Sequence, residues 1–155
     1  MTDADTPAVD AAPVDPAEVR RVFMLIHTGR EEAREVGLAC AKSLAVHGIV
    51  VRVLASEAAD LGIDPAAYEP QLELAADEDD ASRDCELALV IGGDGTILRA
   101  AEIVQPHRTP VLGVNLGHVG FLAEAEYDDV ESTIEAIVQR RYTSEAVSYT
   151  HLTLP

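Results

Sequence analysis

Short runs of apolar residues alternate along the chain with longer segments in which apolar residues recur every three or four positions. A short apolar run between turn residues is typical of a strand buried on both faces, and the three-to-four spacing is typical of a helix with one buried face. Strands are predicted at Val22–His27, Ile49–Leu54, Leu87–Ile91 and Val111–Val114. Helices are predicted from Glu31 to His47, from Ile97 to Val104 and from Asp128 to Arg141. This alternation predicts an α/β fold with a parallel sheet and right-handed crossovers.

The same pattern divides the chain into parts. Residues 1–19 are rich in Ala, Asp, Pro and Thr, and they cannot bury enough surface to offset their ordering entropy, so a disordered acidic tail is predicted there. Residues 20–142 contain all the predicted elements and form one α/β domain. A chain of 155 residues with 48% hydrophobic residues can build one ordinary core. The acidic run Asp77–Asp80 is interpreted as a solvated loop without chemistry.

A glycine-rich turn follows the third predicted strand. Its sequence is Gly92-Gly93-Asp94-Gly95-Thr96, and a predicted helix comes next. Glycines accept positive φ and carry no side chain, so their backbone N–H groups can approach an anion; the predicted phosphate loop consists of Gly92, Gly93, Gly95 and Thr96. Asp94 would place a carboxylate beside this anion, which is electrostatically unfavourable unless the carboxylate holds a metal ion or accepts a proton from an attacking hydroxyl. Both roles occur in phosphoryl transfer. The alternative is an ordinary turn without a ligand.

A second motif repeats this organisation. Residues 110–124, Pro-Val-Leu-Gly-Val-Asn-Leu-Gly-His-Val-Gly-Phe-Leu-Ala-Glu, read as a short strand that runs into a loop with two further glycines. Ligands of open parallel sheets bind outside the carboxyl ends of such strands. Together the two motifs resemble the amino-terminal domain of NAD kinases, from about Val22 to about Tyr142. The first motif is shared with diacylglycerol and sphingosine kinases and, more loosely, with phosphofructokinases, but the Pro-x-Gly-Thr-Gly-Asn block of the lipid kinases is absent from the sequence.

The resemblance implies a Rossmann-like parallel sheet of the NAD kinase and phosphofructokinase-like type. It also implies an activity, the transfer of a phosphoryl group from ATP or polyphosphate to the adenosine 2′-hydroxyl of NAD to give NADP, with Mg²⁺ or another divalent cation. Asp94 would be the catalytic base and would contact the dinucleotide together with Gly95. Arg99 would lie near the substrate phosphates and Phe121 would line the adenine pocket, although a solvated helix face and ordinary packing are the plain alternatives for these two. No residue is assigned as a metal ligand.

The resemblance ends before the chain does. NAD kinases continue into a β-rich second domain with an Asn-Glu or Asn-Asp pair and a Thr-Gly-Ser-Thr-Ala-Tyr-type motif, and neither occurs in this sequence. Residues 148–155, Ser-Tyr-Thr-His-Leu-Thr-Leu-Pro, resemble the translated adapter tails that end some assembled gene fragments. We therefore expect a truncated gene product that lacks the second domain and is inactive alone, with residues 143–155 as an unstructured end of artefactual origin. The full-length enzyme is expected to be a homo-oligomer.

Charge and cysteine content narrow the possible functions. The chain has 28 acidic and 11 basic residues and a net charge of −17, which disfavours binding to nucleic acid or to an anionic membrane. Cys40 and Cys85 have neither metal-binding nor redox spacing. Because no apolar run is long enough to span a membrane and no signal peptide is recognisable, a cytoplasmic protein is predicted. A lipid-kinase-like domain and a non-catalytic nucleotide-binding module stay open as alternatives.

Overall fold

The computed structural model describes residues 19–64, 66, 71–115, 123–145 and 151–153 of the chain. The strands are β1 (Arg21–Ile26), β2 (Val50–Leu54), β3 (Leu72–Ala75), β4 (Leu87–Gly92), β5 (Val111–Asn115), β6 (Thr143–Glu145) and β7 (His151–Thr153). The α-helices are α1 (Glu31–Val46), α2 (Ala55–Leu61), α3 (Asp94–Val104) and α4 (Ala123–Val138), and the 3₁₀ turns are η2 (Glu78–Asp80) and η3 (Gln105–His107). The predicted amino-terminal tail lies, apart from residue 19, outside the described residues.

The strands form one sheet in the order β3-β2-β1-β4-β5-β7-β6. The first five strands in this order, β3, β2, β1, β4 and β5, are parallel to their neighbours. Strand β7 is parallel to β5, and β6 is antiparallel to β7. The predicted parallel α/β sheet is thus confirmed, with the four predicted strands side by side. Between β1 and β4 the order of the strands reverses, since β2 and β3 lie on one side of this pair and β5 lies on the other.

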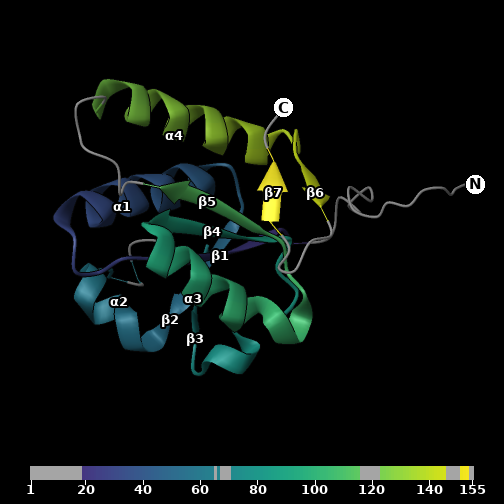
Figure 1. The fold of residues 1–155 in the computed structure, drawn as a ribbon. Coiled ribbons are helices and arrows are strands. Elements are labelled where there is room, and N and C mark those ends of the chain that lie inside the picture. The colour runs from purple at the N-terminus through teal and green to yellow at the C-terminus, as the bar shows by residue number, and fades with distance from the viewer. Residues whose placement is uncertain (1–18, 65, 67–70, 116–122, 146–150, 154–155) are drawn as a thin grey trace, which may run out of the picture.

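The two central strands are buried on both faces, which explains their uninterrupted apolar sequences. On β1, Val22, Met24 and Ile26 belong to a core cluster with residues of α1 and α4. Phe23 and Leu25 belong to a second cluster with residues of α3. Helices α1 and α4 therefore cover one face of the sheet and α3 covers the other, as Figure 1 shows.

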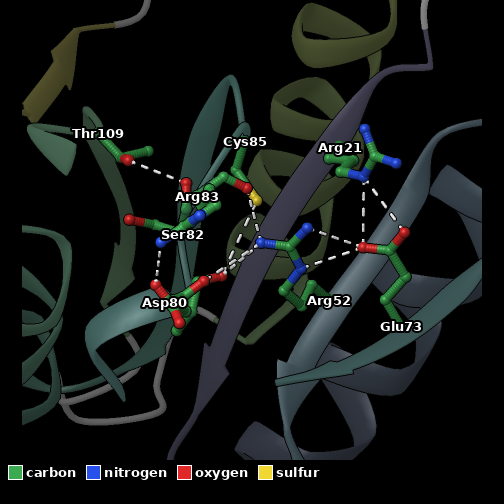
Figure 2. A network of polar contacts seen from close by, with 9 residues as sticks. Arg21, Arg52, Glu73, Asp80, Ser82, Arg83, Cys85 and Thr109 are labelled. Atoms are coloured by element: carbon green, nitrogen blue, oxygen red, sulfur yellow. Dashed lines mark hydrogen bonds and ion pairs between the residues drawn. The ribbon is translucent and has the colours of Figure 1, made fainter. Parts of the chain in front are cut away.

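Half-buried charged side chains connect the strands in the half of the sheet near β3. Arg52 on β2 donates hydrogen bonds of 3.0 and 2.8 Å to Glu73 on β3, and Arg21 on β1 donates to the same carboxylate at 3.2 and 3.3 Å. The Arg52 guanidinium also donates to the backbone carbonyls of Ala81 and Arg83 in the loop before β4 (Figure 2). Burial alone would raise the pKa of Glu73, but the hydrogen bonds from Arg52 and Arg21 outweigh it and hold the pKa of this carboxyl below its ordinary value.

Two parts of the chain differ from the sequence prediction. The segment from Ala55 to Asp84 contains α2 and β3, which the weak pattern did not predict. Strand β3 is at the edge of the sheet, and its Leu74 is 45% exposed, so it lacks the apolar run of a central strand. Residues 143–155 were expected to be unstructured, but the structure places β6 and β7 there.

Candidate active site

The strand order places a crevice between β1 and β4. After β1 the chain leads to α1 on one face of the sheet, and after β4 it leads to α3 on the other face. Two loops that leave neighbouring strand ends toward opposite faces open a crevice at the carboxyl edge, which is the usual ligand position in open α/β sheets. The crevice has a volume of about 470 Å³ and is lined by Ile26, His27, Thr28, Arg30, Glu57, Gly93, Gly95, Thr96 and Arg99.

The glycine turn is tighter than the sequence predicted. Helix α3 begins at Asp94 rather than at Ile97, so Asp94, Gly95 and Thr96 form its first turn. Gly93 is the residue before the helix, and its carbonyl accepts the first helical hydrogen bond from Ile97 N–H at 3.1 Å. The N–H groups of a first helical turn have no intrahelical acceptor and form a partially positive end. The start of α3 is therefore suited to an anion, as the phosphate-loop hypothesis requires.

Of the three glycines in this turn, Gly92 is needed for close approach, and none has a positive φ. Gly93 has a φ of −106°, and within the described chain the glycines with positive φ are Gly48 and Gly62. A Cβ at Gly92 would lie 2.8 Å from Thr96 Oγ1 and 3.1 Å from His27 Cβ, whereas a Cβ at Gly93 or Gly95 would meet nothing within 4 Å. Gly92 thus lets the two walls of the crevice come together, and the other two glycines leave open space.

Asp94 is exposed at the first position of α3. Its neighbours Gly93 and Gly95 line the crevice, but Asp94 itself is not among the lining residues. A negative charge at a helix start interacts favourably with the helix dipole. The turn therefore places an exposed carboxylate next to an open crevice at the start of α3.

Arg99 lines the crevice, but its guanidinium is already engaged. It donates to Glu57 on α2 at 2.7 Å and to Glu78 on η2 at 2.9 Å. The hydrogen bond with Glu57 is the main cause that raises the pKa of Arg99 above its ordinary value. Because two carboxylates balance one cation, Arg99 brings no excess positive charge to the crevice in this conformation. Its predicted role near the substrate phosphates stays a prediction.

The second motif meets the first through strand register. Asn115, the last residue of β5, is paired with Gly92 at the end of β4. Gly113 lies under α3, where a Cβ would stand 2.9 Å from Ile97 Cδ1, so this glycine permits α3 to pack on β5. Residues 116–122 of the motif, with Phe121, lie outside the described residues, and the predicted adenine contact of Phe121 stays a prediction.

Residues 22–142 match the profile of the ATP-NAD kinase N-terminal domain. The chain belongs to the NAD kinase family. It is 48% identical over 136 residues to an NAD kinase of Mycolicibacterium paratuberculosis. This alignment covers 84% of this chain and 44% of that relative. It is 47% identical over 126 residues to an NAD kinase of Thermobifida fusca, covering 81% of this chain and 38% of the relative. The chain thus spans less than half the length of these relatives.

A solved structure shares the fold. The crystal structure of yeast NADH kinase complexed with NADH is similar to this chain with a TM-score of 0.63 at 20% sequence identity, over 83% of this chain and 38% of the yeast chain. At this identity the likeness concerns the fold alone. It agrees with the parallel sheet and crossing helices that the sequence predicted.

Other reactive side chains of this NAD kinase domain lie away from the crevice. Burial raises the pKa of the Cys40 thiol to about 12 and that of the Cys85 thiol to about 11, so both are un-ionised at neutral pH.

In the part of the chain that the structure describes, no group of three or more His, Cys, Asp and Glu residues is arranged to hold a metal ion. Nor does any described helix have the length and apolar character needed to cross a membrane.

The sequence analysis missed the β1 side of the crevice. His27, Thr28 and Arg30 come from the end of β1 and the loop after it, and they face the glycine turn across the crevice. Their signal was the same as that of the glycine turn, since they too are polar residues directly after a buried strand. Only the strand order shows that these two strand ends are neighbours.

Proposed function

We propose that this chain supplies the amino-terminal part of a catalytic site that phosphorylates the adenosine 2′-hydroxyl of NAD to give NADP, with ATP or polyphosphate as the phosphoryl donor. The observation that carries the proposal is the position of Asp94, an exposed carboxylate at the start of α3 beside a crevice at the carboxyl edge of the sheet. Membership of the NAD kinase family supports the same activity.

The crevice and the exposed Asp94 beside it suggest separate places for the two substrates. The donor phosphates occupy the crevice, where the start of α3 offers backbone N–H groups to their oxygens. The 2′-hydroxyl approaches from the exposed side, where Asp94 takes its proton. The hydroxyl oxygen forms a bond to the terminal phosphorus as the bond from phosphorus to the bridging oxygen breaks, and ADP or the shortened polyphosphate leaves.

The residues present are compatible with a divalent cation. Mg²⁺ in phosphoryl-transfer sites is commonly held by one or two carboxylates together with the substrate phosphates. Asp94 beside the crevice fits such a sparse donor set. When bound, the cation would neutralise the developing charge on the transferred phosphoryl group. This neutralisation is needed because the chain carries a net charge of −17 and Arg99 is already balanced by two carboxylates.

The remaining assignments extend the proposal. Gly95 contacts the dinucleotide, Phe121 lines the adenine pocket, and the whole enzyme is a cytoplasmic homo-oligomer. These assignments rest on the resemblance of the sequence to NAD kinases, and the described residues do not test them.

The proposal is tested by NADP formation. Because the chain spans 44% of the Mycolicibacterium paratuberculosis relative, the assay compares the 155-residue chain with a chimera in which residues 1–142 are continued by the remaining part of that relative. Each protein is incubated with NAD, Mg²⁺ and either ATP or polyphosphate. We expect turnover by the chimera and none by the 155-residue chain. A folded chimera, checked by circular dichroism, that forms no NADP with either donor would contradict the proposed function.

A further inference from the structure

His27 has a position in the crevice that the proposed reaction does not yet use. It is the first residue after β1, and its backbone N–H donates to the carbonyl of Ile91 on β4 at 2.9 Å. This bond continues the ladder between the two central strands by one residue. The backbone of His27 is therefore held by the sheet itself and not by a loose loop.

The orientation of the His27 ring is set by the loop that follows. The backbone N–H of Gly29 donates to Nδ1 of His27 at 3.0 Å. A Cβ at Gly29 would stand 3.0 Å from Cε1 of the ring, so a larger residue would be pushed against the imidazole. Since Nδ1 accepts a hydrogen bond, it carries no proton, and the neutral ring has its proton on Nε2. The ring thus offers one donor, Nε2–H.

This donor belongs to the same hollow as the glycine turn. His27 and Thr96 both line the crevice, and both stand within about 3 Å of the place where a Cβ of Gly92 would be. Within the described part of the chain, Nε2 of His27 has no hydrogen-bond partner. The crevice therefore combines an imidazole N–H, a hydroxyl and the N–H groups at the start of α3. Several donors around one hollow suit a ligand whose surface consists of oxygen acceptors.

We propose that His27 binds the oligophosphate chain of the phosphoryl donor by donating a hydrogen bond from Nε2–H to a phosphate oxygen. The identity of the ligand in this proposal rests on the proposed function. The proposal adds His27, the residue after β1, to a site otherwise formed by the glycine turn. A neutral donor is useful here because the Arg99 guanidinium is held by Glu57 and Glu78. Recognition is of the phosphate chain, whether that chain belongs to a nucleotide or to inorganic polyphosphate.

Two substitutions separate ligand binding from loop structure. In His27→Asn, the side-chain oxygen lies near the place of Nδ1 and can still accept from Gly29 N–H, but nothing reaches the place of Nε2. In His27→Gln, the amide nitrogen can reach the place of Nε2 and donate there. A binding role makes the Asn variant the damaging one, and a purely structural role makes the Gln variant the damaging one. His47→Asn is the matched control, because the ring of His47 contacts the carbonyl of Ser43 at the far end of α1.

The measurement is the affinity of the 155-residue chain for Mg·tripolyphosphate, Mg·ATP and AMP by titration calorimetry. We expect His27→Asn to weaken binding of tripolyphosphate and ATP about tenfold, the scale of one hydrogen bond to a charged acceptor. His27→Gln and His47→Asn should stay within about threefold of the parent. Equal loss for tripolyphosphate and ATP assigns the contact to the phosphate chain, whereas loss for AMP alone would overturn the proposal. Unchanged binding by His27→Asn, or no binding of tripolyphosphate by the parent, would also overturn it.

Two further readouts keep this inference separate from the proposed function. The imidazole ¹⁵N resonances of His27 should show Nδ1 without a proton, and a protonated Nδ1 in the neutral ring would contradict the geometry. In the chimera, NADP formation with an unchanged KM for the donor in His27→Asn would refute the role of His27 alone. Binding of tripolyphosphate that depends on His27, without any NADP formation, would leave this inference standing and refute the proposed function.

Discussion

The two ends of the central strand pair differ sharply. At the amino ends of β1 and β4, Arg20 donates to both oxygens of Glu86 at 2.8 and 2.7 Å, and it also donates to the carbonyls of Ile137 and Val138 at the end of α4. Tyr142 donates to the same carboxylate. At the carboxyl ends of the same strands, an open crevice is lined by donors and by glycines with free space beside them. One end uses its polar groups within the protein, and the other leaves several of them for a ligand.

Within this pair of strands, the contacts at the amino ends contribute to stability, and the crevice at the carboxyl ends is the candidate functional site. Burial acts to raise the pKa of Glu86, but the hydrogen bonds from Arg20 and Tyr142 are together stronger and leave the pKa below its ordinary value. A carboxylate held in this way links the start of β4 to the start of β1 and to the end of α4. Asp94, beyond the other end of β4, is exposed at the first position of α3. Changes at the two ends should therefore affect different measurements.

The largest expected effect is on catalysis by Asp94→Asn. The substitution keeps the shape of the side chain and removes the proposed base, so kcat of the chimera should fall by at least about 10²-fold, with the fold and most of the affinity for NAD retained. Asp84→Asn, just before the amino end of β4, is the matched control. Asp84 has a φ of 63°, which Asn also accepts. Near-normal turnover by Asp94→Asn would make Asp94 a turn residue only.

The opposite result is expected for Arg20→Met. The variant leaves Glu86 without its main donor and two carbonyls of α4 without a partner, and it should lower the free energy of unfolding by about 2–3 kcal/mol. The value is below that of a fully buried pair because the Arg20 and Glu86 side chains are 18% and 16% exposed. Arg83→Met is the control, since the ion pair of Arg83 with Asp80 is 59% and 55% exposed and should contribute less than about 1 kcal/mol. Equal denaturation midpoints for the two variants would remove the proposed structural role.

The amino end should also give the protein a specific acid sensitivity. The folded-state pKa of Glu86 is below the ordinary value of 4.5, so its ionised form stabilises the fold above that pH. This contribution is lost as the pH falls from 4.5 through the lower folded-state pKa. Urea unfolding at a series of pH values should show a smaller pH slope for Glu86→Gln than for the parent. Identical slopes would mean that Glu86 titrates alike in the folded and unfolded states.

The smallest expected effect on stability is at Gly95. A Cβ there meets nothing within 4 Å, and Ala favours the first turn of α3 more than Gly does. Gly95→Ala should therefore raise the free energy of unfolding by about 0.5–1 kcal/mol. If Gly95 contacts the dinucleotide as proposed, the added methyl group of the same variant should also raise KM for NAD. Gly113→Ala, whose Cβ would lie 2.9 Å from Ile97, should instead destabilise the protein.

The sequence predicted the central strands because burial on both faces leaves a continuous apolar run, as on β1 and β4. It did not predict β3, where Glu73 pairs with two arginines and Leu74 is exposed, since an edge strand has no such run. The start of α3 was placed three residues late because Asp94 and Gly95 favour turns when they are considered locally. The position at the end of a buried strand overrides that preference.

The sequence predicted only the side of the candidate site that follows β4, where the glycine turn forms a motif. The glycine turn is contiguous in sequence, and the residue types themselves indicate an anion. His27 shares with the turn only its place directly after a buried strand and belongs to no motif, so its role depends on which strand lies beside it. The partners of Arg99 are 42 and 21 residues away in the sequence, so its neutralisation by Glu57 and Glu78 follows from the fold and not from any local pattern.

The most direct test of the central claim is hydrogen exchange of the chimera with and without NAD and Mg·ATP. If ligands bind at the carboxyl edge, the amides of residues 27–30 and 92–96 should gain protection when both ligands are bound. The amides of residues 19–22 and 84–87, at the amino ends of the same strands, should be unchanged. Protection at the amino ends without any change at residues 92–96 would contradict the assignment of function to the crevice between β1 and β4.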